Sequence, residues 1–111
     1  MPYDRELAER IRALVGGEPA IAEKAMFGGL AFLVDGNMAV AASGQGGLLV
    51  RVDPAETDVL IAAPGVQLFE MGGRSMRGWV SVDDQQLQTT EALARWVERG
   101  LSFARSLPAK G

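Results

Sequence analysis

The connections between apolar segments in the first half of this chain are too short to hold a helix. Four apolar segments follow one another, at 24–27, 30–34, 38–42 and 48–52. They are joined by Gly28-Gly29, by Asp35-Gly36 and by the loop 43–47. Parallel strands need a crossover of about a dozen residues or more, whereas antiparallel strands can be joined by tight turns. Asp-Gly between apolar segments is a strong hairpin signal, so the spacing predicts an antiparallel meander.

Segments at the two ends of the chain have the apolar spacing of amphipathic helices. Asp4 can cap a helix over about 5–15, which Gly16-Gly17 would end, and a last helix is predicted over about 90–107. The apolar stripes are Leu7, Ile11, Leu14 and Val15 in the first helix and Leu93, Val97, Leu101 and Ala104 in the last. Such stripes indicate helices that pack one face against a sheet.

The middle of the chain predicts a short helix followed by two more strands. Asp53-Pro54-Ala55-Glu56 combines a capping residue, a proline suited to the first helical position and a glutamate at the capping-box position. We expect this helix to end near Ala62. Strands are then expected at 66–71 and 78–82, around a turn at Gly72-Gly73-Arg74.

This order of elements predicts an α+β fold. Terminal helices that enclose two groups of strands, with a short helix between the groups, suit a two-layer sandwich. We expect a central antiparallel sheet of about five to six strands, with the N- and C-terminal helices packed on it. The chain has 111 residues, which fit one domain spanning 1–111.

Both faces of the predicted sheet are apolar. Side chains alternate between the two faces of a strand, so Leu30, Phe32 and Val34 share one face, and Ala31 and Leu33 share the other. A solvated face would be more polar. We therefore expect the second face to be covered by the short helix, by the last helix or by a second copy of the chain in a homodimer.

The composition removes several classes of chemistry. The chain has no Cys and no His, which excludes disulfides, thiolate nucleophiles, Ser-His-Asp triads and the usual zinc sites. We expect no catalytic residues, no cofactor and no metal. No apolar run reaches the length of a membrane span, and Met1-Pro2-Tyr3-Asp4 does not begin a basic and then apolar leader. A cytoplasmic protein without a membrane partner is expected.

The segment from Arg74 to Trp79 is the best candidate for a contact surface. Arginines beside an aromatic side chain can clamp an anion, a carboxylate-bearing partner or a nucleobase. Arg51 would join them if its strand neighbours this one. The predicted interaction surface is Arg51, Arg74, Met76, Arg77 and Trp79. The alternative is a solvated hairpin with Trp79 buried in the core.

Other features favour structural roles. The glycine-rich turns lack the spacing of a phosphate-binding loop, and Asp83-Asp84 after a strand favours a turn. Trp96 and Phe103 on the last helix are expected in the core or at an interface. Four methionines near strand ends would form an adaptable surface if exposed, or fill the core if buried: Met26, Met38, Met71 and Met76.

Several segments together resemble the N-terminal domain of the TfoX/Sxy competence regulators. They are 23–38, which reads EKAMFGGLAFLVDGNM, then 48–53, 76–82 and 96–101. The resemblance implies a two-layer α/β sandwich and a single-domain member of the family. In the full-length regulators this domain precedes a helical domain, and those proteins activate competence genes together with a cyclic-AMP receptor protein. The resemblance implies no catalytic or ligand-binding residues.

Composition and resemblance together favour a non-enzymatic regulatory or scaffolding module that binds another protein, whose identity the sequence does not give. One alternative is a small-ligand-binding protein or an enzyme that uses an interior pocket. The other is direct nucleic-acid binding in transcription, which would need Arg51, Arg74 and Arg77 on one face. The net charge of −3 disfavours that alternative, because affinity for nucleic acid comes largely from clustered basic residues.

Overall fold

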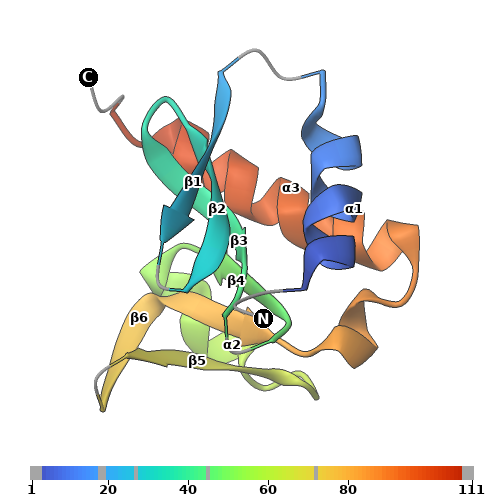
Figure 1. The fold of residues 1–111 in the computed structure, drawn as a ribbon. Helices are drawn as coiled ribbons and strands as arrows, with labels where there is room; N and C mark the ends of the chain where they lie inside the picture. Colours follow the sequence, from blue (N-terminus) through green and yellow to red (C-terminus); the bar gives the residue numbers. More distant parts are fainter. Residues whose placement is uncertain (1–3, 18–19, 27, 45, 72, 109–111) are drawn as a thin grey trace.

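A single antiparallel sheet forms the centre of the fold (Figure 1). The structure, a computed structural model, describes residues 4–17, 20–26, 28–44, 46–71 and 73–108. Within them the sheet has six strands in the order β1-β2-β3-β4-β6-β5. The strands are β1 (Ile21–Met26), β2 (Gly29–Val34), β3 (Asn37–Ala42), β4 (Leu48–Arg51), β5 (Val66–Met71) and β6 (Arg74–Val82). The predicted α+β class, with an antiparallel sheet of about five to six strands, is confirmed.

The helices begin where the sequence places their caps. They are α1 (Arg5–Val15), α2 (Thr57–Leu60) and α3 (Thr90–Ser106), with 3₁₀ turns η1 (Pro54–Glu56) and η2 (Asp84–Leu87). Asp4 accepts hydrogen bonds from the backbone N–H groups of Glu6 and Leu7, and Asp53 accepts one from Ala55. These bonds satisfy donors that have no partner within the helix. The predicted start and end of α1 and the capping role of Asp53 are confirmed.

Three boundaries differ from the sequence prediction by two residues or more. Strand β1 begins at Ile21 rather than near residue 24, because Ile21–Met26 pairs with β2 along its whole length. Strand β6 begins at Arg74 rather than at 78, so the expected hairpin loop is mostly strand. The helix expected as far as Ala62 is split into η1 and α2 and ends at Leu60. Phe27, expected to end the first strand, lies outside the described residues.

The hairpin between β2 and β3 forms at the predicted Asp-Gly pair. Asp35 has φ 51° and Gly36 has φ 83°. Positive φ at both central residues is the signature of a type I′ turn, whose twist matches that of the flanking strands. The turn sets the pairing of Val34 with Asn37.

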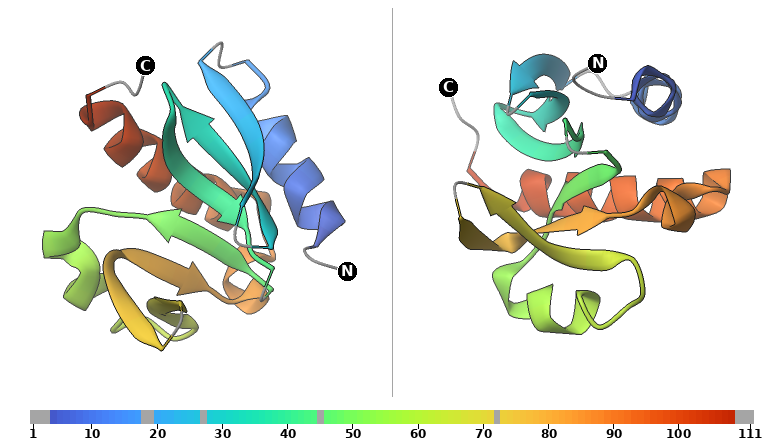
Figure 2. Two further views of the ribbon diagram at one scale, coloured as in Figure 1. Left: turned by 60° about the vertical axis from the view of Figure 1, so that its left-hand side comes forward. Right: turned by 60° about the horizontal axis from the view of Figure 1, so that its bottom comes forward.

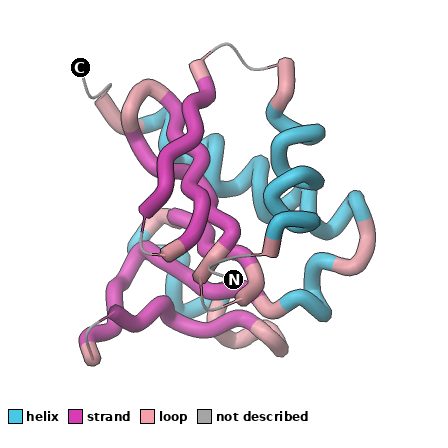
Figure 3. The backbone as a smooth tube through the Cα atoms, viewed as in Figure 1, coloured by secondary structure: helices cyan, strands magenta, loops and turns pink. Residues whose placement is uncertain are grey.

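Helices α1 and α3 form a second layer on one face of the sheet (Figures 2 and 3). Their buried side chains join the main apolar cluster, which includes Phe32, Val40, Val50 and Val80 from the strands. Leu60 and Ile61 of the α2 region pack against the same cluster. The prediction that the N- and C-terminal helices pack on the sheet is confirmed.

Gly100 allows α3 to lie against β3. A Cβ atom at this position would lie 2.5 Å from the carbonyl oxygen of Ala39 and 2.7 Å from Cγ1 of Val40. Real Cβ atoms essentially never approach other heavy atoms this closely. The short distance between α3 and the sheet therefore depends on glycine, which has no side chain, at position 100.

The other face of the sheet is buried without a helix. Its cluster contains Ala31, Met38, Ala41, Leu49 and Phe69, with Leu33 and Trp79 packed against it, and all come from strands. The expectation that the short or last helix covers this cluster is wrong among the described residues. The strand pairing shifts register next to Leu33 and next to Phe69, and such bulges bend a strand and increase its twist. The two halves of the sheet consequently run in different directions (Figure 2).

An ion pair ties α1 to the edge strand β1. The Arg12 guanidinium donates hydrogen bonds to both carboxylate oxygens of Glu23, at 2.6 and 2.7 Å. These hydrogen bonds hold the pKa of Glu23 below its usual value. Both side chains are well exposed, so the pair fixes geometry more than it adds stability. No helix in the described ranges is long and apolar enough to cross a lipid bilayer.

Candidate functional site

The side chain of Arg51 is held by two aromatic rings. Its Cζ atom lies 5.0 Å from the centre of the Trp79 ring and 5.8 Å from the centre of the Phe103 ring. Arg51 and Trp79 are direct partners in the pairing of β4 with β6, whereas Phe103 comes from α3. A cation within about 6 Å of an aromatic centre is attracted by the ring. Two strands and a helix therefore fix the position of one guanidinium.

This guanidinium is half-buried and has no acidic partner in the part of the chain that the structure describes. Burial lowers the pKa of Arg51, because the charged form loses some of its contact with water. Within the described ranges the side chain of Arg51 neither donates a hydrogen bond nor forms an ion pair. Its N–H donors are therefore available to a group from another molecule.

The structure brings together only two residues of the predicted surface, Arg51 and Trp79. Arg74 is exposed at the first position of β6, five residues before Trp79, and pairs with Met71 of β5. Met76 and Arg77 belong to β6, but their side chains lie outside the described residues. The predicted alternative, a solvated hairpin with Trp79 buried in the core, is found in part: residues 73–75 are exposed, and Trp79 is half-buried and packs against the strand-only cluster.

Gly78 connects β6 to the start of α2 and so helps to place Trp79. Its carbonyl oxygen accepts a hydrogen bond of 2.8 Å from the N–H of Val52. Its own N–H donates to Oγ1 of Thr57 at 3.1 Å, and Thr57 is fully buried. The pairing of β5 with β6 shifts register just beside this point.

We expect Thr57→Val to destabilise the protein by about 1–2 kcal/mol, because a buried N–H that loses its acceptor pays for its desolvation. Valine keeps the shape of threonine but has no hydroxyl group. Thr57→Ser is the matched control, since it keeps the acceptor. Urea denaturation measures both variants. A Thr57→Val protein as stable as the wild type would show that this hydrogen bond contributes nothing.

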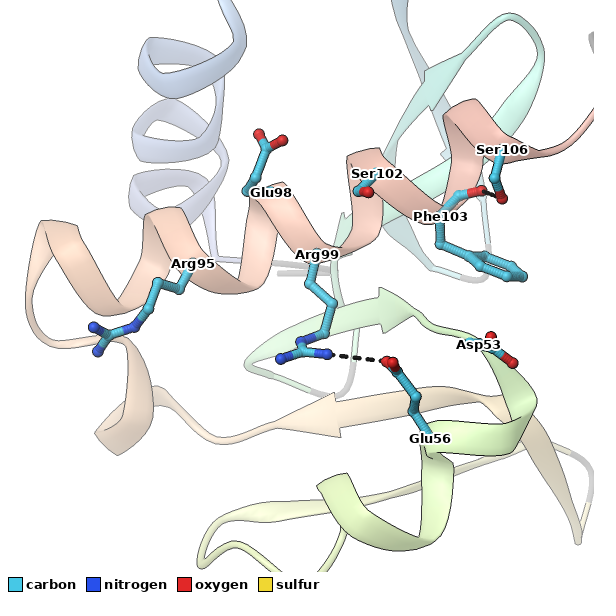
Figure 4. Close-up of a pocket in the computed structure, with 8 residues that line it drawn as sticks. All are labelled: Asp53, Glu56, Arg95, Glu98, Arg99, Ser102, Phe103 and Ser106. Carbon is cyan, nitrogen blue, oxygen red and sulfur yellow. Dashed lines mark hydrogen bonds and ion pairs between the residues drawn. The ribbon is translucent and has the colours of Figure 1, made fainter.

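An open groove lies beside the Arg51 site, between α3 and η1 (Figure 4). Its volume is about 570 Å³, and its lining residues are Asp53, Glu56, Arg95, Glu98, Arg99, Ser102, Phe103 and Ser106. Nη1 of Arg99 donates to Oε1 of Glu56 at 3.1 Å across the groove, so the glutamate expected in a capping box pairs with α3 instead. Phe103 belongs to both features, because it lines the groove and contacts Arg51.

The polar groups of the groove lie at its surface. In the ranges that the structure describes, no group of three or more acidic, His or Cys side chains is placed to hold a metal ion. The buried polar side chains there are Asn37, Ser43 and Thr57, and no buried side-chain nitrogen or oxygen lacks a hydrogen-bond partner. The groove offers charges of both signs and hydroxyl groups at its surface.

Sequence reasoning missed the contribution of α3 to the site. Arg95, Arg99 and Phe103 follow one another at four-residue steps, which places them on one face of a helix. That spacing could have indicated a second functional face. The apolar stripe of the same helix indicated only the face that packs on the sheet. Spacing could not show that this face lies opposite η1. Arg99 and its partner Glu56 are separated by 43 residues in the chain.

Comparison with known proteins identifies the family of this chain. Residues 13–104 match the family model described as the TfoX N-terminal domain. The matched span includes Arg51, Trp79 and Phe103. No curated protein matches this chain.

Proposed function

The chain belongs to the TfoX N-terminal domain family, and from this membership we propose that it is a regulatory or scaffolding module that binds another protein without chemistry of its own. The resemblance to the competence regulators supports a role in regulation. Its binding surface is the groove between α3 and η1, together with the adjoining Arg51 site.

The open groove beside an aromatic-held arginine is the observation that carries this proposal. Arginine and aromatic residues are enriched where proteins bind one another, and they supply most of the binding energy at such surfaces. Here Phe103 and Arg51 meet at one end of a groove that is lined by exposed polar groups. A protein segment can use both parts at once.

The lining of the groove favours a protein over a small ligand. Pockets for small molecules are mostly apolar with a few polar groups. This groove is instead lined by three carboxylates, two guanidinium groups and two hydroxyls, with Phe103 as its aromatic member. Charges of both signs also disfavour a nucleic acid, whose backbone needs a positively charged surface.

Ser102→Arg tests the proposal, because Ser102 is exposed and a long side chain there would fill the groove. The tagged protein is used to capture partners from a lysate of its own cells, with mass spectrometry as the readout. We expect a specific partner whose recovery falls about tenfold in the variant, which corresponds to about 1.4 kcal/mol of binding energy.

Gln85→Arg is the matched control. Gln85 is exposed on η2, outside the groove, so this variant adds the same charge elsewhere and should recover the partner at the wild-type level. Both variants should keep the wild-type melting temperature. Recovery of nothing except the protein itself, or equal recovery with Ser102→Arg, would contradict the proposal.

A further inference from the structure

We propose that Arg51 is the receptor for a single carboxylate group, presented by an acidic side chain of the bound protein. This inference deepens the proposed function and rests on it. It assigns the chemical class of the group that binds at the Phe103 end of the groove.

The guanidinium of Arg51 is already in place before a ligand binds. Trp79 and Phe103 hold it at 5.0 and 5.8 Å, so little side-chain freedom remains to be lost when a ligand binds. Binding sites gain affinity when this cost is removed in advance. A flexible surface arginine would not have this advantage.

The guanidinium of Arg51 also has unused hydrogen-bonding capacity among the described residues. Arg51 has no hydrogen-bond acceptor in the described ranges, although the rings already shield it from part of the solvent. A guanidinium presents its N–H groups as a planar fork that matches a carboxylate. An incoming carboxylate would replace the lost water and pair with a guanidinium that has no ion-pair partner within the described ranges.

Arg51 contrasts with several other arginines that the structure describes. Arg99 also contacts a ring, that of Trp96 at 5.9 Å, but it is paired with Glu56. Arg105 pairs with Glu98 and Arg12 with Glu23. Among the arginines that the structure shows against an aromatic ring, Arg51 is the one without a carboxylate.

Local charge favours a carboxylate over a phosphate. Asp53 follows Arg51 by two residues and lines the groove with Glu56, and the net charge of the chain is −3. A doubly charged phosphate would meet stronger repulsion from these groups than a singly charged carboxylate. The groove beside Phe103 has room for the residues that flank an acidic side chain.

The test is a titration of the full chain with a blocked pentapeptide that has a central glutamate flanked by alanine and serine. The same peptide with a central glutamine is the matched probe, and inorganic phosphate is the competing anion. Binding is followed by the NMR signals of the arginine Nε–H groups and of the Trp79 indole N–H. We expect the Arg51 signal to shift in a saturable way, with the glutamate peptide bound about tenfold more tightly than the glutamine peptide.

Arg51→Lys should weaken that preference clearly, because lysine keeps the charge but lacks the planar fork that pairs with both oxygens of a carboxylate. Arg105→Lys, on the exposed face of α3, should retain it. Equal binding of the two peptides, equal shifts of other arginine signals, an unchanged preference in Arg51→Lys, or saturation by phosphate alone would overturn the proposal.

The two proposals can fail separately. If the captured partner binds Arg51→Lys as tightly as the wild type, a protein-binding function stands and the carboxylate receptor does not. If no partner is captured while the glutamate peptide binds in an Arg51-dependent way, the receptor stands and the regulatory function does not.

Discussion

Phe32→Ala should cost about 3–5 kcal/mol of stability, which is the range for removing a large aromatic side chain from a core. Phe32 is fully buried in β2, within the cluster that joins the sheet to α1 and α3. A domain of this size is typically stable by about 5–15 kcal/mol, so the variant should retain only part of its stability or unfold. Urea denaturation followed by circular dichroism measures the change.

Leu33→Ala is the matched control for this prediction. Leu33 is the next residue in the chain, but it is half-buried and packs against the smaller cluster on the opposite face. Its loss should therefore cost clearly less than the loss of Phe32. Equal effects of the two substitutions would contradict the division of the core into a helix-covered cluster and a smaller, strand-only cluster.

Gly100→Ala should destabilise the protein by about 2–3 kcal/mol, as overpacking of a tight contact does. Helix propensity alone predicts the opposite sign, because alanine is favoured over glycine within a helix by about 1 kcal/mol. A Cβ here would lie 2.5 Å from the Ala39 carbonyl oxygen, which belongs to the backbone of a central strand. The helix would have to move away from the sheet.

The midpoint of urea denaturation decides the sign of this effect. Ser102→Ala is the control, because Ser102 is exposed on the same helix and its replacement should be neutral or slightly stabilising. If Gly100→Ala were as stable as the wild type or more so, α3 would not depend on close contact with β3.

The local features of the fold could be predicted from the sequence. The Asp4 cap, the apolar stripe of α1 and the Asp35-Gly36 turn each depend on residues that are close together in the chain. One predicted member of that stripe is wrong, because Leu14 is exposed. The start of β1 could not be predicted in the same way. Ala22, Glu23 and Lys24 are weak strand formers, and pairing with β2 makes them a strand.

Only the part of the site that depends on neighbouring strands could be predicted from the sequence. The prediction that Arg51 would meet Trp79 depended on β4 lying beside β6, and the sheet order fulfils that condition. Phe103 and the groove depend on how α3 crosses the sheet. No periodicity in the sequence specifies that crossing, because it results from the packing of many side chains and from the close approach at Gly100.

The Arg99–Glu56 pair also determines how readily the groove accepts a ligand. Both side chains are substantially exposed, at 43% and 54%, and such pairs contribute only about 0–1 kcal/mol. A partner that separates them would therefore lose less than about tenfold in affinity. A ligand can therefore separate the Arg99–Glu56 pair at little cost. The groove can then admit groups that are larger than its resting shape allows.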